Sequence, residues 1–235
     1  MRGIDVSHWS GSVAWREVSR DGQDFVYIKA TEGINREDPV CARYIAGARK
    51  AGLHLGVYHY LHTRLPGDAQ ANWCLDRAQA AGYRPASDMV VALDLEDPMA
   101  KARGAAAIRE VVNSFVTTIH ERTGRTCLLY GSRSWLDTWL GEGFGELPLW
   151  LAHYSAEPVP LPKGWSTWAV WQYSDHGAVD GVMGPCDVNR TNGRAAFLRL
   201  VPPVEPAARS RVRVAVNSSP THETTQSALR CEAAE

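Results

Sequence analysis

Short apolar runs rich in Val, Ile, Leu and Tyr recur along the first half of the chain, and stretches with apolar residues at helical spacing lie between them. Runs of this length are typical of buried strands, whereas longer segments with a period near 3.6 residues are typical of helices. The pattern predicts strands at 3–7, 25–33, 54–60, 89–96 and 126–132, and helices at 39–52, 67–82 and 104–124. Strands that alternate with helices indicate βα units and a mostly parallel sheet.

The pattern changes after about residue 145. Three further strands are predicted at 147–155, 166–174 and 184–191, and only short loops rich in Pro and Gly separate them. Five βα-like units followed by three bare strands supply eight strands, which is enough to close a barrel. We therefore predict an α/β protein whose residues 1–201 form a single irregular, TIM-like barrel.

The composition changes again at Pro202. Residues 202–235 are rich in Pro, Ser, Thr and Ala and poor in aromatic residues, which is typical of a linker or a flexible tail. The segment "RVRVAV" at 211–216 is the one piece of it that could form a strand. We expect no independent domain here, because the tail is too short to fold without a metal or disulfides.

Composition excludes several classes of protein. A formal net charge of -1 disfavours nucleic acid as a partner, because phosphate binding needs a concentrated basic surface. The five cysteines are odd in number, widely spaced and without a CxxC pair, so we expect buried free thiols rather than disulfides or a zinc site. The start "MRGIDVSHWS" lacks the apolar region of a signal peptide, and no apolar run approaches a membrane span. We expect a cytoplasmic product without membrane contact that needs a separate release step to act outside the cell.

Carboxylates gather where strands are predicted to end. In "MVVALDLEDP", Asp94 and Glu96 are two residues apart, so both point to one face of the strand. Asp5 lies near the end of the first predicted strand and Asp187 in the last. If all four meet at the mouth of the barrel, their mutual repulsion separates their pKa values and keeps one carboxyl protonated near neutrality. General-acid cleavage of a glycosidic bond needs such a group.

These acids could also have structural or metal-binding roles. Each acid could cap a helix or pair with Arg or Lys, and four clustered carboxylates could also hold Mg²⁺ or Ca²⁺. The metal is disfavoured because no phosphate-cradling loop accompanies the acids, and we expect no metal and no cofactor. His54 and His62 flank one strand eight residues apart, and His59 points to the opposite face, so the three cannot easily share an ion.

Six ordered blocks of sequence resemble glycoside hydrolase family 25, the lysozymes of the Chalaropsis type that include many phage endolysins. The blocks are "GIDVSHWSGSVAW" at the start, "YIKATEG" at 27–33, "GVYHY" at 56–60, "ALDLE" at 92–96, "LWLAHY" at 149–154 and "WQYSDHGAVDGVMGPCDVN" at 171–189. The resemblance covers about residues 2–200. It implies a (β/α)5(β)3 barrel that cleaves the β-1,4 bond between N-acetylmuramic acid and N-acetylglucosamine, with peptidoglycan glycan strands as its partner and a monomer as its state.

The resemblance also implies roles for the carboxylates. Glu96 would be the proton donor, and Asp5 and Asp187 match the aspartates of the family's first and last strands. Retention through the substrate's own N-acetyl group would leave Asp94 to orient that group, while direct attack by Asp94 stays open.

Further side chains are expected to bind substrate. The tyrosines that resemble the family's cleft tyrosines are Tyr58, Tyr130 and Tyr154, with barrel filling as the alternative. Trp171 and Gln172 are neighbours, so one of them faces inward, and we favour Gln172. Glu32 is either a further cleft acid or a structural partner of Lys29.

Two other functions compete with a muramidase. A chitinase-like hydrolase also ends a strand in DxE, but its strand usually reads DxxDxDxE, and here the upstream positions carry no acids. A glycan-binding barrel without catalysis would have no need for both Asp94 and Glu96. No wall-binding module is recognisable after the barrel, so the sequence does not indicate how the protein is targeted.

Overall fold

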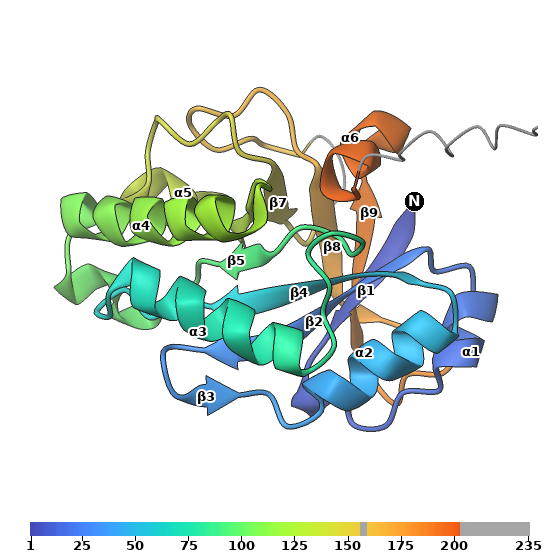
Figure 1. Cartoon of the computed structure of the whole chain (residues 1–235). Coiled ribbons are helices and arrows are strands. Elements are labelled where there is room, and N and C mark those ends of the chain that lie inside the picture. The colour runs from blue at the N-terminus through green and yellow to red at the C-terminus, as the bar shows by residue number, and fades with distance from the viewer. Residues whose placement is uncertain (156–158, 203–235) are drawn as a thin grey trace, which may run out of the picture. The chain divides into compact units, whose positions relative to one another are not determined.

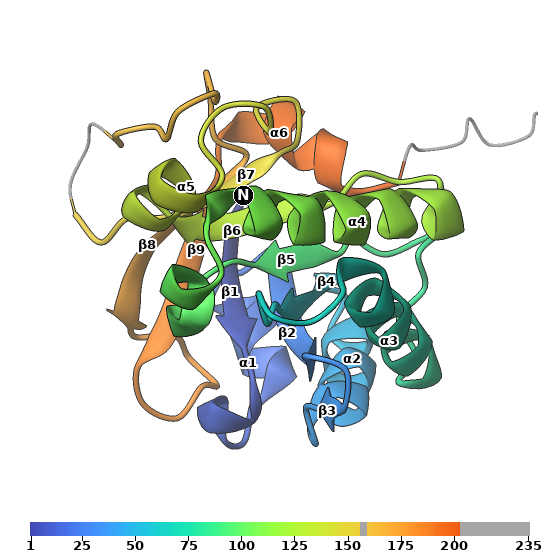
Figure 2. The same cartoon turned by 90° about the vertical axis from the view of Figure 1, so that its left-hand side faces the viewer.

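The computed structural model describes residues 1–155 and 159–202, and in this part of the chain eight strands close into a barrel (Figures 1 and 2). The strands follow the order β1-β9-β8-β7-β6-β5-β4-β2, and pairing of β1 with β2 closes the ring. A short β3 adds to the edge of β2. The strands are β1 (Arg2–Val6), β2 (Phe25–Glu32), β3 (Arg36–Glu37), β4 (His54–Tyr60), β5 (Ala92–Asp94), β6 (Leu128–Ser132), β7 (Leu149–Ala152), β8 (Val170–Gly177) and β9 (Cys186–Thr191).

Helices follow the first five barrel strands. They are α1 (Trp15–Arg20), α2 (Cys41–Lys50), α3 (Gly67–Ala80), α4 (Ala105–Thr123) and α5 (Arg133–Trp139), with short 3₁₀ helices at η1 (His8–Ser10) and η2 (Pro98–Ala102). Strands β7, β8 and β9 follow with no α-helix in the described residues between them, and β9 runs antiparallel to both β8 and β1. This arrangement confirms the predicted (β/α)5(β)3 barrel.

A last helix, α6 (Gly193–Leu200), was not predicted, and it closes the end of the barrel where the strands begin. Its Phe197 packs against Phe25 and His54, the first residues of β2 and β4. The carbonyl of Leu200 accepts a hydrogen bond from the backbone N–H of Val90. Val90 thus donates to α6 rather than to a neighbouring strand, and β5 spans only Ala92–Asp94 of the predicted strand 89–96.

Three helices escaped prediction for a common reason. Helices α1, α5 and α6 have 6, 7 and 8 residues, so each completes about two turns. Two turns are too short for the apolar period of a helix to be recognised. The possible strand at 211–216 lies outside the described residues.

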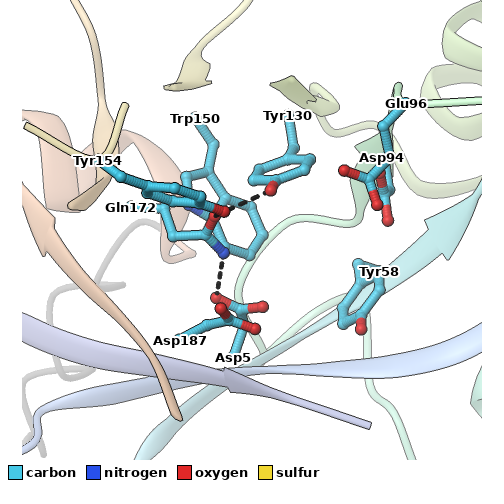
Figure 3. A pocket seen from close by; sticks show the side chains of 9 residues that line it. All are labelled: Asp5, Tyr58, Asp94, Glu96, Tyr130, Trp150, Tyr154, Gln172 and Asp187. Atoms are coloured by element: carbon cyan, nitrogen blue, oxygen red, sulfur yellow. Dashed lines mark hydrogen bonds between the residues drawn. The ribbon is translucent and has the colours of Figure 1, made fainter. Parts of the chain in front are cut away.

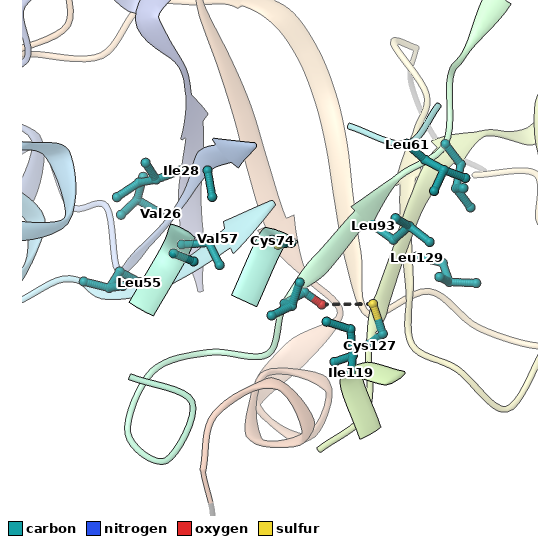
Figure 4. Close-up of a cluster of buried hydrophobic side chains, with 14 of the residues drawn as sticks. Val26, Ile28, Leu55, Val57, Leu61, Cys74, Leu93, Ile119, Cys127 and Leu129 are labelled. Carbon is teal, nitrogen blue, oxygen red and sulfur yellow. Dashed lines mark hydrogen bonds between the residues drawn. The ribbon is translucent and has the colours of Figure 1, made fainter. Parts of the chain in front are cut away.

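Alternating side chains divide the barrel into an inner and an outer layer. Ile28, Val57 and Leu93 belong to the outer layer that packs beneath the helices (Figure 4). Tyr27 and Trp150 belong to the inner cluster and fill the barrel. Two glycines make room for aromatic rings of this inner cluster. A Cβ at Gly3 would lie 2.5 Å from the Phe25 ring, and a Cβ at Gly56 would lie 2.3 Å from the Tyr27 ring.

We expect Gly56→Ala to lower the free energy of unfolding by about 1–3 kcal/mol, because the added methyl must displace the Tyr27 ring from a packed interior. Chemical denaturation of the two proteins measures the difference. In a background that already carries Tyr27→Leu, the same glycine substitution should cost less, since the smaller side chain leaves room for the methyl. An unchanged midpoint in Gly56→Ala would contradict this packing.

Four of the five cysteines lie in the described part, and they are Cys41, Cys74, Cys127 and Cys186, all buried and free. Burial raises the pKa of Cys41, Cys74 and Cys186 to about 12, so these thiols stay protonated. The expectation of buried free thiols is confirmed for these four. Cys231 lies outside the described residues. In the described ranges, no helix combines the length and the apolar character that crossing a membrane requires.

Candidate active site

A pocket of about 170 Å³ lies at the ends of the parallel strands, opposite α6 (Figure 3). Its lining consists of Asp5, Tyr58, Asp94, Glu96, Tyr130, Trp150, Tyr154, Gln172 and Asp187. All of the predicted site residues except Glu32 are therefore in its wall.

The carboxylates from β5 arise through strand alternation. Leu93 and Leu95 are buried in the outer layer, so Asp94 and Glu96 both face the pocket. Asp94 is buried, and its Oδ1 has no hydrogen-bond partner among the described residues. Glu96 lies two residues after the end of β5 and is exposed at the rim.

The pKa of each of these carboxyl groups is raised. Burial first, and then the charge of Glu96, raise the pKa of Asp94 well above its ordinary value. Burial and the charge of Asp5 raise the pKa of Glu96. Two acids this close cannot both ionise readily, so the pair holds a proton that it can donate.

The second pair comes from strands at opposite ends of the chain. Asp5 and Asp187 are register partners of the antiparallel pair β1 and β9. Asp5 Oδ2 accepts hydrogen bonds from Gln172 Nε2 at 2.9 Å and Asn189 Nδ2 at 2.8 Å. Burial raises the pKa of Asp5 to about 6 in spite of these two donors. Burial and then the charge of Asp5 raise the pKa of Asp187 to about 8, so Asp187 is the protonated member of the pair at neutral pH.

The raised pKa of Asp187 predicts a pH-dependent stability. Its pKa is about 8 in the fold and ordinarily 3.8, so the folded chain keeps a proton that the unfolded chain releases between these values. That contribution to stability is fully present below pH 3.8 and is lost as the pH rises through about 8. Asp187→Asn carries no such proton. We expect the fall in Tm between about pH 5 and about pH 8 to shrink by a few degrees in this variant.

Thermal denaturation at the two pH values measures the effect. Glu121→Gln is the matched control, because Glu121 is an exposed acid on α4 that does not line the pocket. A fall in Tm that is the same in Asp187→Asn and in the wild type would show that Asp187 is not held protonated.

Gln172 links the tyrosines to the Asp5 pair. Its Oε1 accepts from the hydroxyls of Tyr130 at 2.8 Å and Tyr154 at 2.7 Å, while its Nε2 donates to Asp5. The neighbouring Trp171 lies on the other side of the strand and donates its indole N–H to the carbonyl of His153 at 2.7 Å. Gln172 is thus the residue of "WQYS" that faces the pocket, and three of its neighbours are oriented by one buried amide.

Two residues of this network were not predicted as site residues. Trp150 lines the pocket and donates its indole N–H to Asn189 Oδ1 at 2.8 Å, which turns the amide of Asn189 toward Asp5. Because an indole nitrogen only donates, this bond sets which end of the Asn189 side chain faces the carboxylate. Asn189 could have been recognised from the sequence, because it lies two residues after Asp187 on β9 and therefore points to the same face of the strand.

Glu32 lies outside the pocket and makes ion pairs. Its carboxylate contacts Lys29 Nζ at 3.0 Å, His62 Nε2 at 3.1 Å and Arg36 Nη1 at 3.4 Å. Partial burial acts in the opposite direction, but the hydrogen bond and charge of Lys29 lower the pKa of Glu32. The structure therefore places it as the partner of Lys29 rather than in the wall of the pocket.

The third acid of "MVVALDLEDP", Asp97, is structural. Its carboxylate accepts from the backbone N–H and the hydroxyl of Thr63, both at 2.7 Å, and from the backbone N–H of Met99 at 2.9 Å. It thereby caps η2 and ties the loop after β4 to the loop after β5.

The pocket continues into a neighbouring depression of about 380 Å³. Tyr58, Asp94, Glu96 and Asp187 line both, and Trp9, on η1, adds an indole that is 84% exposed. An open groove of this kind suits a polymer better than a small enclosed ligand. In the described ranges, no group of three or more His, Cys, Asp or Glu side chains is placed to hold a metal ion.

A barrel whose strand ends carry paired, partly protonated carboxyls beside tyrosine hydroxyls in an open groove has the features of a glycoside hydrolase. Comparison with known families agrees: the model of glycosyl hydrolases family 25 matches residues 4–182. The chain belongs to this family, and it is a glycoside hydrolase.

Individual relatives support the assignment. Lysozyme M1 of Streptomyces globisporus is 36% identical over 207 residues, which cover 84% of this chain and 70% of that protein. The N,O-diacetylmuramidase of Chalaropsis sp is 32% identical over 196 residues, which cover 77% of this chain and 91% of that protein. The crystal structure of a bacterial lysozyme from Streptomyces coelicolor is 35% identical, with a TM-score of 0.78 over 85% of this chain and 95% of that one.

Proposed function

We propose that this protein is an N-acetylmuramidase that hydrolyses the β-1,4 bond between N-acetylmuramic acid and N-acetylglucosamine in peptidoglycan. The observation that carries the proposal is the pair formed by Asp94 and Glu96, in which a buried oxygen without a partner among the described residues lies beside an exposed acid of raised pKa. The names of the relatives, a lysozyme and an N,O-diacetylmuramidase, support the same substrate.

In this mechanism Glu96 is the general acid. Its proton passes to the glycosidic oxygen as the bond to C1 breaks, so that the leaving sugar departs as a neutral alcohol. The carbonyl oxygen of the neighbouring acetamido group attacks C1 from the opposite face and forms a cyclic oxazolinium. Water then attacks C1, Glu96 accepts the proton of that water, and the product keeps the configuration of the substrate.

Asp94 holds the acetamido group during these steps. Its free Oδ1 accepts the acetamido N–H, which turns the carbonyl oxygen toward C1 and stabilises the positive charge that develops. That bond also favours the ionised form of Asp94, so the proton of the pair is driven onto Glu96 when the sugar binds.

The rest of the pocket positions the sugar. Tyr58, Tyr130 and Tyr154 present hydroxyls and ring faces, and the amide of Gln172 holds the last two in place. Asp5 and Asp187 supply a further negative charge opposite the Asp94 pair (Figure 3). As a monomer, the protein would act on the bacterial cell wall once released from the cell.

Product analysis tests the assignment. Purified protein incubated with peptidoglycan should release fragments with new reducing-end N-acetylmuramic acid, which borohydride reduction and mass spectrometry identify. New reducing-end N-acetylglucosamine would make the enzyme a glucosaminidase or a chitinase-like hydrolase. Binding without any new reducing ends would make it a glycan-binding barrel.

A further inference from the structure

A second cavity, of about 730 Å³, lies beside the catalytic groove and takes no part in the proposed chemistry. The loop between β4 and α3 forms one wall, and residues 97–99 form the other. Tyr60 lines both this cavity and the groove that holds Asp94 and Glu96. The cavity and the groove are therefore neighbours that share one wall residue.

The walls are held in place before any ligand arrives. Buried Gln70 accepts the backbone N–H of His62 at 2.8 Å and donates to the carbonyls of His62 at 3.0 Å and Leu65 at 3.2 Å. Asp97 fixes the same loop through Thr63. A preorganised loop of this kind loses little entropy when a ligand binds.

The charges of the lining leave one group unpaired. Glu32 is surrounded by Lys29, His62 and Arg36, and hydrogen bonds from Thr63 and Met99 satisfy Asp97. Among the described residues that line the cavity, Arg64 is the charged side chain without a hydrogen bond or ion pair, and it is exposed. The cavity therefore offers a guanidinium to an anion, and the planar guanidinium matches the geometry of a carboxylate or a phosphate.

The remaining lining is Tyr60 and three apolar side chains. Leu65, Pro98 and Met99 contribute aliphatic surface, and Met99 is 42% exposed. Aliphatic surface beside an unpaired cation fits a short peptide with small apolar side chains and a free carboxylate.

We propose that this cavity binds the acidic peptide carried by the muramic acid residues of the substrate, with Arg64 pairing with a peptide carboxylate. The inference rests on the proposed muramidase function and names what the enzyme recognises beside the glycan. Binding of the peptide in this cavity makes the enzyme selective for glycan strands that still carry their peptides.

The test compares soluble peptidoglycan strands with the same strands stripped of peptide by an amidase, using release of reducing-end N-acetylmuramic acid as the readout. The measured quantity is the ratio of kcat/KM on peptide-bearing strands to kcat/KM on stripped strands. We expect a ratio above one for the wild type. In Arg64→Ala this ratio should fall about three- to tenfold, the range of a charged hydrogen bond at a partly open site.

Two further variants sharpen the result. Arg64→Lys keeps the charge and should retain an intermediate ratio, whereas Arg16→Ala, which removes an exposed arginine on α1, should keep the wild-type ratio. High salt should lower the wild-type ratio toward that of Arg64→Ala, because it screens the ion pair.

Three outcomes would overturn the inference: a wild-type ratio of one, a ratio unchanged in Arg64→Ala, or an equal loss on both substrates, which would mean that Arg64 contacts sugar. Failure of the proposed function looks different, since the wild type would then release no reducing-end N-acetylmuramic acid from either substrate.

Discussion

Glu96→Gln should lower kcat/KM on peptidoglycan by at least about 100-fold, the lower bound for removal of a general acid. The amide keeps the size of the side chain at the exposed rim but has no proton of suitable acidity. On an aryl glycoside of the same sugar with a good leaving group, the loss should be much smaller, because that group departs without protonation. Reducing-end release and aryl alcohol release, measured with the same preparations, give the two losses.

The pH profile adds a second readout for Glu96. A general acid must be protonated to act, so wild-type activity falls on the alkaline side as the acid ionises, and this limb should disappear in Glu96→Gln. Glu110→Gln, an exposed position on α4, is the matched control and should behave as the wild type. Equal losses on both substrates would assign the acid role elsewhere, with Asp187 the next candidate because its pKa is about 8.

The parts of the site that could be predicted depend on local geometry. Alternation along a strand has a period of two, so two acids two residues apart in "LDLE" had to share a face, and the buried Leu93 and Leu95 had to share the other. The same reasoning separates Gln172 from Trp171. The count of strands followed from apolar runs, and eight strands in this order close into a barrel.

The parts that could not be predicted depend on contacts between distant segments. Asp5 receives its two donors from Gln172 and Asn189, which are 167 and 184 residues away in the chain. No local pattern indicates such partners, and the pKa of about 6 for Asp5 depends on them. Glu32 illustrates the converse case, because its position near a strand end fitted both a cleft acid and a partner of Lys29, and only the contacts with Lys29, Arg36 and His62 in the tertiary structure favour the second.

Asp94→Asn should lower kcat/KM by about 100- to 1,000-fold, the range for loss of one preorganised electrostatic contact to a transition state. The variant has nearly the same shape, but its neutral amide cannot balance the positive charge on the oxazolinium. Its stability should not suffer, because burial disfavours the charged form of Asp94 and its Oδ1 has no partner to lose among the described residues. The comparison is Asp97→Asn, which should lower the Tm at neutral pH because an amide nitrogen, which cannot accept, replaces one of the two oxygens that bind Thr63 and Met99.

The role of Asp94 can then be separated from that of a nucleophile. If the acetamido group attacks C1, a thiazoline analogue of N-acetylmuramic acid should inhibit the wild type competitively, because it mimics the cyclic intermediate. Under the same mechanism azide should not restore activity to Asp94→Ala, since no covalent bond to Asp94 is being replaced. Azide rescue with formation of a glycosyl azide of inverted configuration would instead make Asp94 the nucleophile. The free oxygen of Asp94, buried among tyrosines with no partner in the described part of the chain, favours the first result, because it is placed to accept an N–H.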